Sequence, residues 1–440
     1  MKTKAEQGLT ETFEAALAKL PGGDSVKDAR VAAIGRFGAS GLPHRRVEEW
    51  KYTDLRAAIK DVPAFSADDV AKVTTGDLIV ALGPLAHIDA HRITFVNGRC
   101  HADLTDLAGT DGLEVKPLAG ALSGAPAKIG AGLAATTGPD NDAVSALNTA
   151  FMTDGAIVRI AAGAKVAKPL LIVFVRAGTQ ARFTAVRNIV SAGEGSEATI
   201  IEAHVVLPGA AKDGQTNALS EVTVGKQATL THIKVTADEG KVVHLANWNV
   251  AMEADCIYRG FQYTAGVGLA RNQIFTTYQG QGGKLDLSGA YLAREREHID
   301  TTLVVDHAVP HCESRELFKG VLDGHARGVF QGKIIVRPNA QKTDGKQMAQ
   351  ALMLSPDAEF DSKPELEIYA DDVVCGHGTT SAELDADMLF YCMSRGIPEN
   401  EARALLIESF IGEAIDKVAH DEIRAALMAY AVAWLQASKT

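Results

Sequence analysis

The chain has 440 residues, of which 46% are hydrophobic and 6% aromatic, and it contains 41 glycines. This length allows two or three domains with a large core, and the glycine content suits many short strands better than a helical bundle. The formal net charge of −11 argues against nucleic acid as a partner, because phosphate contacts require clustered Lys and Arg.

The sequence also narrows the cellular setting. No run of 18 apolar residues occurs, so we expect no membrane-spanning helix. The first twenty residues contain three lysines but lack the apolar core of a secretory signal. The cysteines are odd in number and widely spaced, which argues against a disulfide framework and favours a reducing cytoplasm. They are Cys100, Cys256, Cys312, Cys375 and Cys392.

The first third of the chain has a mixed, mostly helical pattern. Apolar residues at helical spacing predict a helix over 10–20. A second helix is predicted over 26–37, with Ser25 as its N-cap and the glycines that follow as its end. We therefore predict a mostly helical N-terminal domain over residues 1–145.

Two other kinds of segment interrupt this domain. The apolar runs at 78–82 and 93–95 resemble short strands. The stretch 118–139 is rich in Gly, Ala and Pro and has little hydrophobic periodicity, so we interpret it as a surface excursion or linker.

Residues 147 to about 374 have a different character, because short apolar runs alternate with turn residues and long helical periods are nearly absent. A weak repeat places glycine two or three residues before several of these runs, at intervals of roughly thirty residues. Stacked units of this kind each bury an apolar face against the next unit. We therefore predict a mainly β protein with a parallel β-helix over 146–376, and a β-sandwich or jelly roll is the alternative. The repeat glycines are Gly195, Gly225, Gly282 and Gly324.

The last region, residues 377–440, has the pattern of a C-terminal helical domain. Asp385 is a suitable N-cap for a helix over 386–394, which Gly396 would end. Asp421 is placed to begin a later helix. We expect this domain to cover the strand edges of the last coil and to offer a surface to a partner.

Cys375 and His377 form the most specific pair of possible metal ligands. Side chains two positions apart on a strand point to the same side, so a thiol and an imidazole would lie next to each other. Both groups bind iron or zinc, but a closed site takes about four ligands, and no CxxC motif occurs in the chain. The pair is therefore at most half of a site. On composition alone the plainer interpretation is favoured, in which both residues serve only packing.

Other candidate motifs are weaker. His307, His311 and Cys312 lie close together, but Pro310 opposes a helix and the glutamate of a HExxH motif is missing, so a structural role is favoured. The glycine-rich stretch at 280–284 lacks the full phosphate-loop pattern. Acidic pairs in the chain could serve a glycosidase, although solvated faces explain them more simply. These pairs are Glu48 with Glu49, Glu365 with Glu367, and Asp371 with Asp372.

Longer motifs point to a known family. They are GLPHRRVEEWKYTDLR, LNTAFMTDGAIVRI, HCESRELFKGVLDGHARGVFQGKIIVRPNAQKTDGKQMAQALMLS and PELEIYADDVVCGHGTTSAELDADMLFYCMSRGI. With these motifs the chain resembles the SufB/SufD family of iron–sulfur cluster assembly proteins over nearly its whole length. The resemblance implies a right-handed parallel β-helix between helical terminal domains. It also implies a cytoplasmic scaffold subunit that is not an enzyme.

The resemblance further implies partners and site residues. Such a subunit pairs with SufB, or forms a homodimer when alone, and its C-terminal helices carry the ATPase SufC. A transient iron–sulfur cluster is shared with SufB, and none is expected in the isolated chain. The histidine of CGHG corresponds to His377, with Cys375 as its neighbour. Tyr391, Arg395 and Gly396 match the region that faces the ATPase.

Two alternatives remain open from the sequence. The single CGHG motif, the chain length and the few cysteines near the C-terminus favour the SufD branch of the family over the SufB branch. A β-helix enzyme that acts on carbohydrates is the alternative from another functional class.

Overall fold

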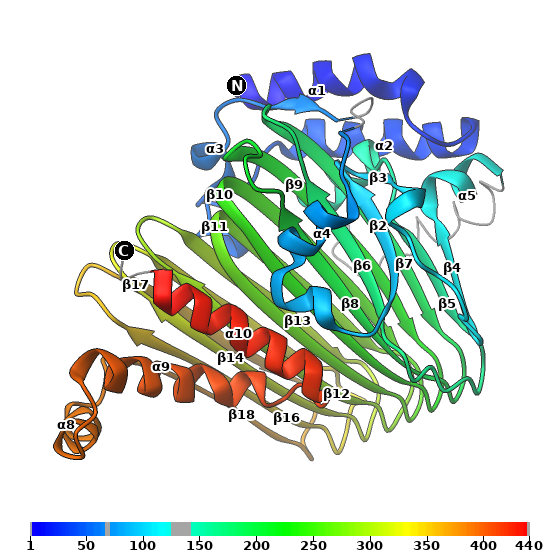
Figure 1. Cartoon of the computed structure of the whole chain (residues 1–440). Coiled ribbons are helices and arrows are strands. Elements are labelled where there is room, and N and C mark those ends of the chain that lie inside the picture. The colour runs from blue at the N-terminus through cyan, green and yellow to red at the C-terminus, as the bar shows by residue number, and fades with distance from the viewer. Residues whose placement is uncertain (1, 67–70, 125–141, 438–440) are drawn as a thin grey trace.

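The computed structural model describes residues 2–66, 71–124 and 142–437. Strands make up 43% of the structure and helices 28%. The strands form a parallel β-solenoid of about 8 turns between N- and C-terminal helical regions (Figure 1). The predicted mainly β fold with a parallel β-helix and helical ends is therefore confirmed.

The solenoid has two walls of parallel strands, and each coil contributes one strand to each wall. The long strands β10 (Thr229–Met252) and β11 (Ile257–Tyr278) turn the corner and so belong to both walls. The first wall also contains β2 (His91–Val96), β6 (Leu170–Arg176), β8 (Glu197–Val206), β12 (Lys284–Ala293), β14 (Glu313–Leu322), β16 (Asp344–Met353) and β18 (Val374–Ala382). The second wall also contains β1 (Ala64–Phe65), β5 (Ala156–Ile160), β7 (Arg182–Ala192), β9 (Asp213–Val224), β13 (His298–His307), β15 (Arg327–Val336) and β17 (Glu359–Ile368).

At the first end of the solenoid, two short strands each pair antiparallel with a strand of one of the walls. They are β3 (Arg99–Cys100), which pairs with β2, and β4 (Leu113–Pro117), which pairs with β5. At the other end, we predicted that the β-helix ends at residue 376. The strand β18 crosses this boundary and continues to Ala382.

One corner of the coils explains the glycine repeat. The residue two positions before a strand of the first wall has a left-handed backbone in successive coils, which favours glycine. Gly195 and Gly282 fill this position with φ of 64° and 75°. Gly225 is needed for another reason, since an added Cβ would lie 2.6 Å from the Ala192 carbonyl oxygen of the preceding coil. Non-glycine residues occupy the same corner in the other coils: Gln227, Asp255, His311 and Lys342.

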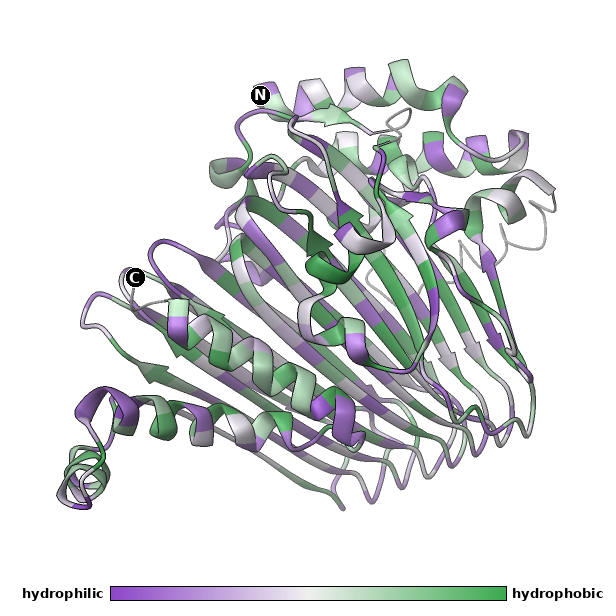
Figure 2. Cartoon of the chain, viewed as in Figure 1, coloured by the Kyte–Doolittle hydropathy of each residue, from purple (hydrophilic) through white to green (hydrophobic). Residues whose placement is uncertain are grey.

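Hydrophobic and hydrophilic residues alternate along many of the strands (Figure 2), and successive side chains of a strand point to opposite faces. Residues such as Leu230, Leu285 and Phe330 form the interior core between the walls. The outward residues of the first wall, including Leu292 and Val321, form a second core with the helices that cover them.

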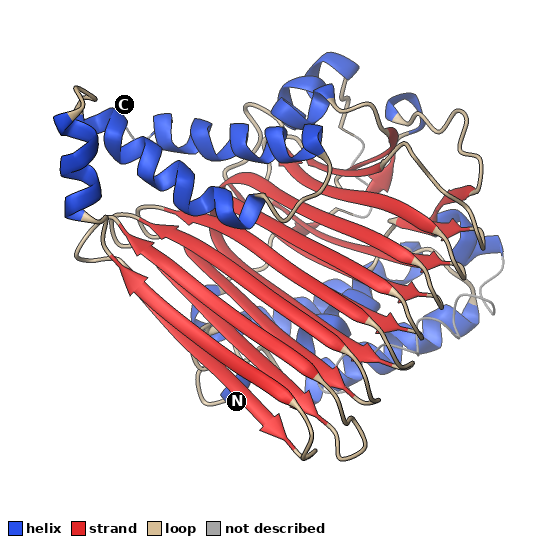
Figure 3. Cartoon of the chain, turned by 90° about the horizontal axis from the view of Figure 1, so that it is seen from below, coloured by secondary structure: helices blue, strands red, loops and turns tan. Residues whose placement is uncertain are grey.

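Helices cover both outer faces (Figure 3). The helices α1 (Lys4–Ala16), α2 (Asp24–Ser40) and α7 (Ala143–Phe151) share a core with the outward residues Phe183 and Leu245 of the second wall. The first wall is covered by α4 (Thr75–Leu82), α9 (Glu399–Ile415) and α10 (Asp421–Ala437). Shorter helical segments are η1 (Leu17–Lys19), η2 (Glu48–Trp50), α3 (Leu55–Ala58), η3 (Gly83–His87), η4 (Ala102–Leu104) and α5 (Leu118–Gly124).

Several predicted elements differ from the structure. The run 78–82 is helical and lies in α4, because Thr74 and Asp77 form a capping box that starts a helix there. The helix predicted from residue 26 begins at Asp24 with Gly23 at its N-cap, instead of Ser25. The linker predicted over 118–139 begins with the helix α5, and its part from residue 125 onward lies outside the described residues.

The C-terminal helices do not cover the strand edges of the last coil, contrary to our prediction. The helix α9 packs on β12 and β14, and Lys319 of β14 forms an ion pair with Glu413 and lies 4.4 Å from the Phe410 ring centroid. The helix packs on β12 and β14 because the outward side chains of these two strands are apolar and are buried only when a helix lies over them. No residue of β17 or β18 is buried. The solenoid therefore has an open end.

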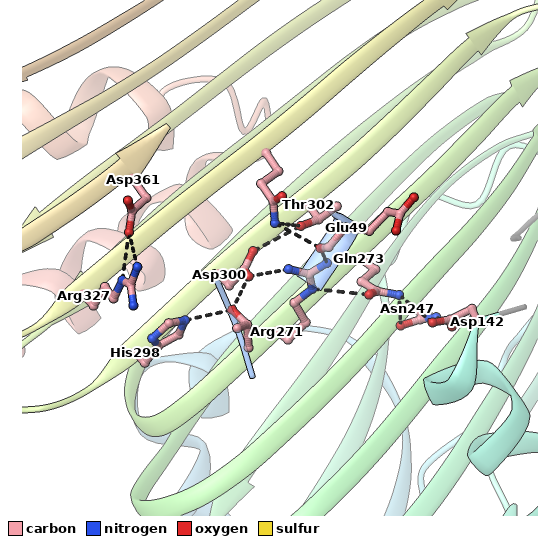
Figure 4. A network of polar contacts seen from close by, with 12 residues as sticks. Glu49, Asp142, Asn247, Arg271, Gln273, His298, Asp300, Thr302, Arg327 and Asp361 are labelled. Atoms are coloured by element: carbon pink, nitrogen blue, oxygen red, sulfur yellow. Dashed lines mark hydrogen bonds and ion pairs between the residues drawn. The ribbon is translucent and has the colours of Figure 1, made fainter. Parts of the chain in front are cut away.

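A polar network fastens the N-terminal region to the second wall (Figure 4). The Arg271 guanidinium forms an ion pair with Asp300 and lies 4.2 Å from the Trp50 ring centroid. It also donates a hydrogen bond of 2.7 Å to the Glu49 carbonyl oxygen. Thr53 donates a further hydrogen bond to Asp300. These contacts join segments more than 200 residues apart and explain why the Trp50 segment is ordered on the solenoid.

Candidate functional site

Cys375 and His377 lie two positions apart on β18, the last strand of the first wall. In the register of this wall, Cys375 is paired with Gly345 and His377 with Gln347 of β16. Cys375 is half-buried and packs against the interior core, and His377 is on the same side of the strand because the two residues are two positions apart. The interior is open at the last coil, so the His377 side chain is exposed. The two possible ligands therefore share the rim of the open end.

The strands at this end have free edges. In the described part of the chain, β18 pairs with β16 and β17 pairs with β15, and no further strand lies beyond either of them. Such an edge presents backbone N–H and C=O groups that another strand can pair with. The site is thus bordered by a surface that favours a second polypeptide.

The Cys375 thiol keeps its proton in the surroundings that the chain provides. Burial raises the pKa of Cys375 above its ordinary value of 9.0, and the carboxylates of Asp344 and Glu316 raise it further. A hydrogen bond with the Gly345 backbone acts in the opposite direction and has a smaller effect than burial. The thiolate needed for a metal ligand would therefore form only when a cation or a cationic partner group approaches.

The described part of the chain contains no further cluster of metal ligands beside this pair. Across residues 2–66, 71–124 and 142–437, no group of three or more His, Cys, Asp or Glu side chains is arranged to hold a metal ion. His307 is buried, and its Nε2 lies 3.1 Å from the Ser314 hydroxyl. His311 occupies a coil corner and Cys312 is buried beneath it. The pair at the open end therefore has two donors from this chain.

The interior behind the pair contains an acid that the sequence did not single out. Glu316 of β14 is paired in register with Gln347, which in turn is paired with His377. Glu316 is only 3% exposed. Burial raises its pKa from 4.5 to about 8, although the nearby Ser314 hydroxyl favours the ionised form. Glu316, Gln347 and His377 form one row across three neighbouring strands. This row can be recognised only from the strand register, so the spacing of these residues in the sequence gave no signal for it.

The helix α8 (Ala386–Ser394) follows β18 after three residues. The Asp385 side chain caps it by accepting hydrogen bonds from the backbone N–H groups of Asp387 and Met388, as predicted. No residue of α8 is buried. Its exposed side chains include several large hydrophobic ones: Met388, Phe390, Tyr391 and Met393.

The three residues predicted to face an ATPase lie at the end of this helix. Tyr391 is 56% exposed, and the Arg395 guanidinium lies 5.1 Å from its ring centroid. Gly396 has a left-handed backbone with φ of 87°, which suits glycine after a helix end. An exposed apolar helix is typical of a docking surface.

The acidic pairs weighed for glycosidase chemistry are largely engaged with lysines. Glu365 and Glu367 both contact Lys333, at 3.9 and 3.0 Å. Glu48 lies 2.6 Å from Lys363. These residues lie on the outer surface, in agreement with the interpretation as solvated faces.

Comparisons with known proteins agree with this architecture. Residues 174–410 match the family model described as "SUF system FeS cluster assembly, SufBD core domain", and residues 3–172 match "SufBD protein N-terminal region". The chain is 30% identical over 432 residues to an iron–sulfur cluster assembly SufBD family protein of Synechocystis, covering 95% of this chain and 93% of that protein. It is 29% identical over 393 residues to the iron–sulfur cluster assembly protein SufD of Escherichia coli, covering 89% and 88%.

A parallel β-solenoid with helical ends and matches to both family models defines the class of this protein. The chain belongs to the SufB/SufD family of SUF-system iron–sulfur cluster assembly proteins. Among the described residues, none of the helices has the length and apolar character needed to cross a bilayer.

Proposed function

We propose that this chain is a cytoplasmic scaffold subunit, without catalytic activity of its own, on which an iron–sulfur cluster is built or received. The observation that carries the proposal is the position of Cys375 and His377 at the rim of an open solenoid end. Two donors are too few for a cluster, which takes about four protein ligands. The missing ligands then come from a second polypeptide at the same end.

The free edges of β17 and β18 support this arrangement. A strand of a partner can add its backbone hydrogen bonds to an exposed edge and so extend the wall. A related β-helix subunit of the SufB type is the partner we propose, and a second copy of this chain takes its place when the chain is alone. The nascent cluster would then be cargo held between the two subunits.

The exposed helix α8 supports a second contact. Phe390 is 73% exposed and Met388 and Tyr391 are each 56% exposed, which is costly for a surface that stays in water. We propose that this helix binds an ATPase of the SufC type, with Tyr391, Arg395 and Gly396 at the contact. ATP hydrolysis would belong to that partner.

Anaerobic co-expression with the neighbouring assembly subunits tests the proposal. We expect the His377→Ala complex to purify with all subunits and to keep its unfolding temperature, while the cluster absorbance of the purified complex falls several-fold. His311→Ala is the matched control, because this exposed histidine lies in a coil corner and outside the row of His377. Equal cluster absorbance for His377→Ala and the wild type would reject the site. Loss of the complex would instead support the packing role.

A further inference from the structure

The last coil of the solenoid and the coil before it have opposite charge. Residues 355–387 contain ten Asp and Glu, one Lys and no Arg. Residues 323–354 contain five Lys and Arg but only two Asp and no Glu. The open end of the solenoid is therefore acidic, and the coil beneath it is basic.

These two coils are joined by ion pairs on the outer face of the second wall. Four outward carboxylates of β17 take part, and we call them the β17 acidic row: Glu359, Asp361, Glu365 and Glu367. Arg327 of β15 contacts the first two at 3.5 and 2.6 Å (Figure 4), and Lys333 contacts the other two at 3.9 and 3.0 Å. The register places Arg327 opposite Glu359 and Lys333 opposite Glu365, so these are direct cross-strand pairs. The row thus binds a strand that carries cations on its outward face.

The β17 acidic row has such a strand on one side only. Among the described strands, β15 alone pairs with β17, and the opposite edge of β17 is free. Each of these β15 cations is shared by two carboxylates, and 29–68% of each carboxylate side chain in the row is exposed. Lys363 is the one cation on the outward face of β17, and it also lies 2.6 Å from Glu48 of the N-terminal region. The free edge therefore presents more negative charge than this chain compensates.

We propose that the β17 acidic row determines the partner at the open end, and that the partner pairs with β17 through a strand that carries Lys or Arg on its outward face. This inference rests on the proposed function, because it names the chemistry of the second polypeptide. Within the chain, β15 is an example of a strand that fits the row. A similar strand on the free edge would add backbone hydrogen bonds and give the carboxylates cations on both sides.

The same row acts against a second copy of this chain. Two copies that meet at their open ends bring the same excess of negative charge to both sides of the interface, and like charges on facing strands are destabilising. Salt screens attraction and repulsion alike. A rise in salt should therefore weaken the complex with a basic partner and strengthen the self-association of this chain. This opposite response distinguishes charge recognition from simple burial of the strand edge.

The salt dependence of both associations tests the proposal, measured by sedimentation velocity with the full-length chain. The probe is the purified SufB-type subunit that is co-expressed with this chain. We expect its dissociation constant to rise about tenfold between about 50 and about 500 mM NaCl, whereas self-association becomes tighter. Glu365→Gln combined with Glu367→Gln should weaken partner binding about tenfold at the lower salt concentration, the order expected for two partly exposed charge pairs. This Gln variant should also have a flatter salt dependence.

A second variant reverses the charges. Glu365→Lys combined with Glu367→Lys leaves two carboxylates and three ammonium groups on the outward face of β17, so two variant copies can pair opposite charges. We expect this Lys variant to self-associate more tightly than the wild type and to lose the partner. Damage to the fold of β17 would weaken both associations, so tighter self-association reports a change in charge recognition.

Glu114→Gln combined with Glu197→Gln is the matched control, because these partly exposed carboxylates also contact lysines but lie on β4 and β8, in the first coils. Its affinity for the partner should equal that of the wild type. Wild-type affinity in the Gln variant, weaker self-association in the Lys variant or an equal loss in the control would overturn the inference and leave the two-subunit site standing. A normal cluster absorbance in the His377→Ala complex would instead reject the proposed function.

Discussion

Asp300 and Arg271 form an ion pair between neighbouring strands of the second wall, and both side chains are at most 1% exposed. The same aspartate accepts a hydrogen bond from Thr53, and the arginine stacks on Trp50. One pair of charges therefore joins the N-terminal segment to the solenoid. Its removal is the most direct test of how the two parts stabilise each other.

We expect Asp300→Ala to destabilise the protein by about 3–5 kcal/mol, because the Arg271 charge would be left buried without its partner. The midpoint of urea unfolding measures the effect. Asp361→Ala is the control, since Asp361 pairs with Arg327 at a position where both side chains are about one-third exposed. A partly exposed pair contributes about 0–1 kcal/mol. Equal shifts for the two variants would show that burial of the Asp300 pair has no special effect.

The acid side of the stability profile should depend on His307. Burial lowers the pKa of His307 from 6.5 to about 4. Between pH 6.5 and 4, His307 is protonated in the unfolded chain but stays neutral in the folded chain. The free energy of unfolding therefore falls as the pH drops from 6.5 to 4. Above pH 6.5 this residue makes no contribution. A shift of this size corresponds to about 3 kcal/mol.

His307→Gln should therefore flatten the pH dependence of stability between pH 6.5 and 4. Denaturant unfolding at a series of pH values measures this slope. His311→Gln is the control, because the His311 side chain is exposed in its coil corner. An unchanged slope in His307→Gln would assign the acid sensitivity to other groups.

Gly332 and Gln347 should be energetically coupled across the interior. A Cβ added to Gly332 would lie 2.2 Å from Gln347 Oε1, so the carboxamide would lose its place. We expect Gly332→Ala to destabilise by about 1–3 kcal/mol. In the background of Gln347→Ala the same change should cost less, because the clashing side chain is gone. A double-mutant cycle of unfolding free energies measures the coupling, and additive effects would contradict it.

The exposed and buried faces of the C-terminal helices should respond in opposite ways to a charge. Phe390→Asp on α8 should change the unfolding free energy by less than about 0.5 kcal/mol and abolish co-purification of the ATPase partner. Ile411→Asp on α9 places a carboxylate in a buried position and should destabilise the helical region directly. Thermal unfolding and pull-down of the partner are measured together. Retained ATPase binding in Phe390→Asp would remove α8 from the proposed contact.

Local signals in the sequence were sufficient for much of the fold. The coil length follows from the glycine repeat, although Gln227 and Asp255 fill the same left-handed corner without being glycines. The cap at Asp385 follows from side-chain chemistry that acts within one helical turn. Asp421 is the first residue of α10 and not its N-cap. The prediction of a strand over residues 78–82 was wrong, because periodicity alone does not distinguish a short apolar strand from a helix.

Features that depend on register could not be predicted from the sequence. Glu316, Gln347 and His377 are about thirty residues apart, and only the pairing of whole coils places them in one row. The position of α9 was missed for a related reason, because the sequence shows which side of a helix is apolar but not which strand it will cover. The ion pair of Asp300 with Arg271 is likewise a product of coil stacking.

The short connection between β18 and α8 has a mechanical consequence. Residues 383–385 join the two elements, so Ala382 and Ala386 can be separated by at most about 14 Å, even when the backbone is fully stretched. A displacement of α8 beyond this reach would have to unwind α8 or separate β18, which carries His377, from β16. A partner that moves α8 would thus also disturb the strand that carries Cys375 and His377, because the connection between the two elements is short.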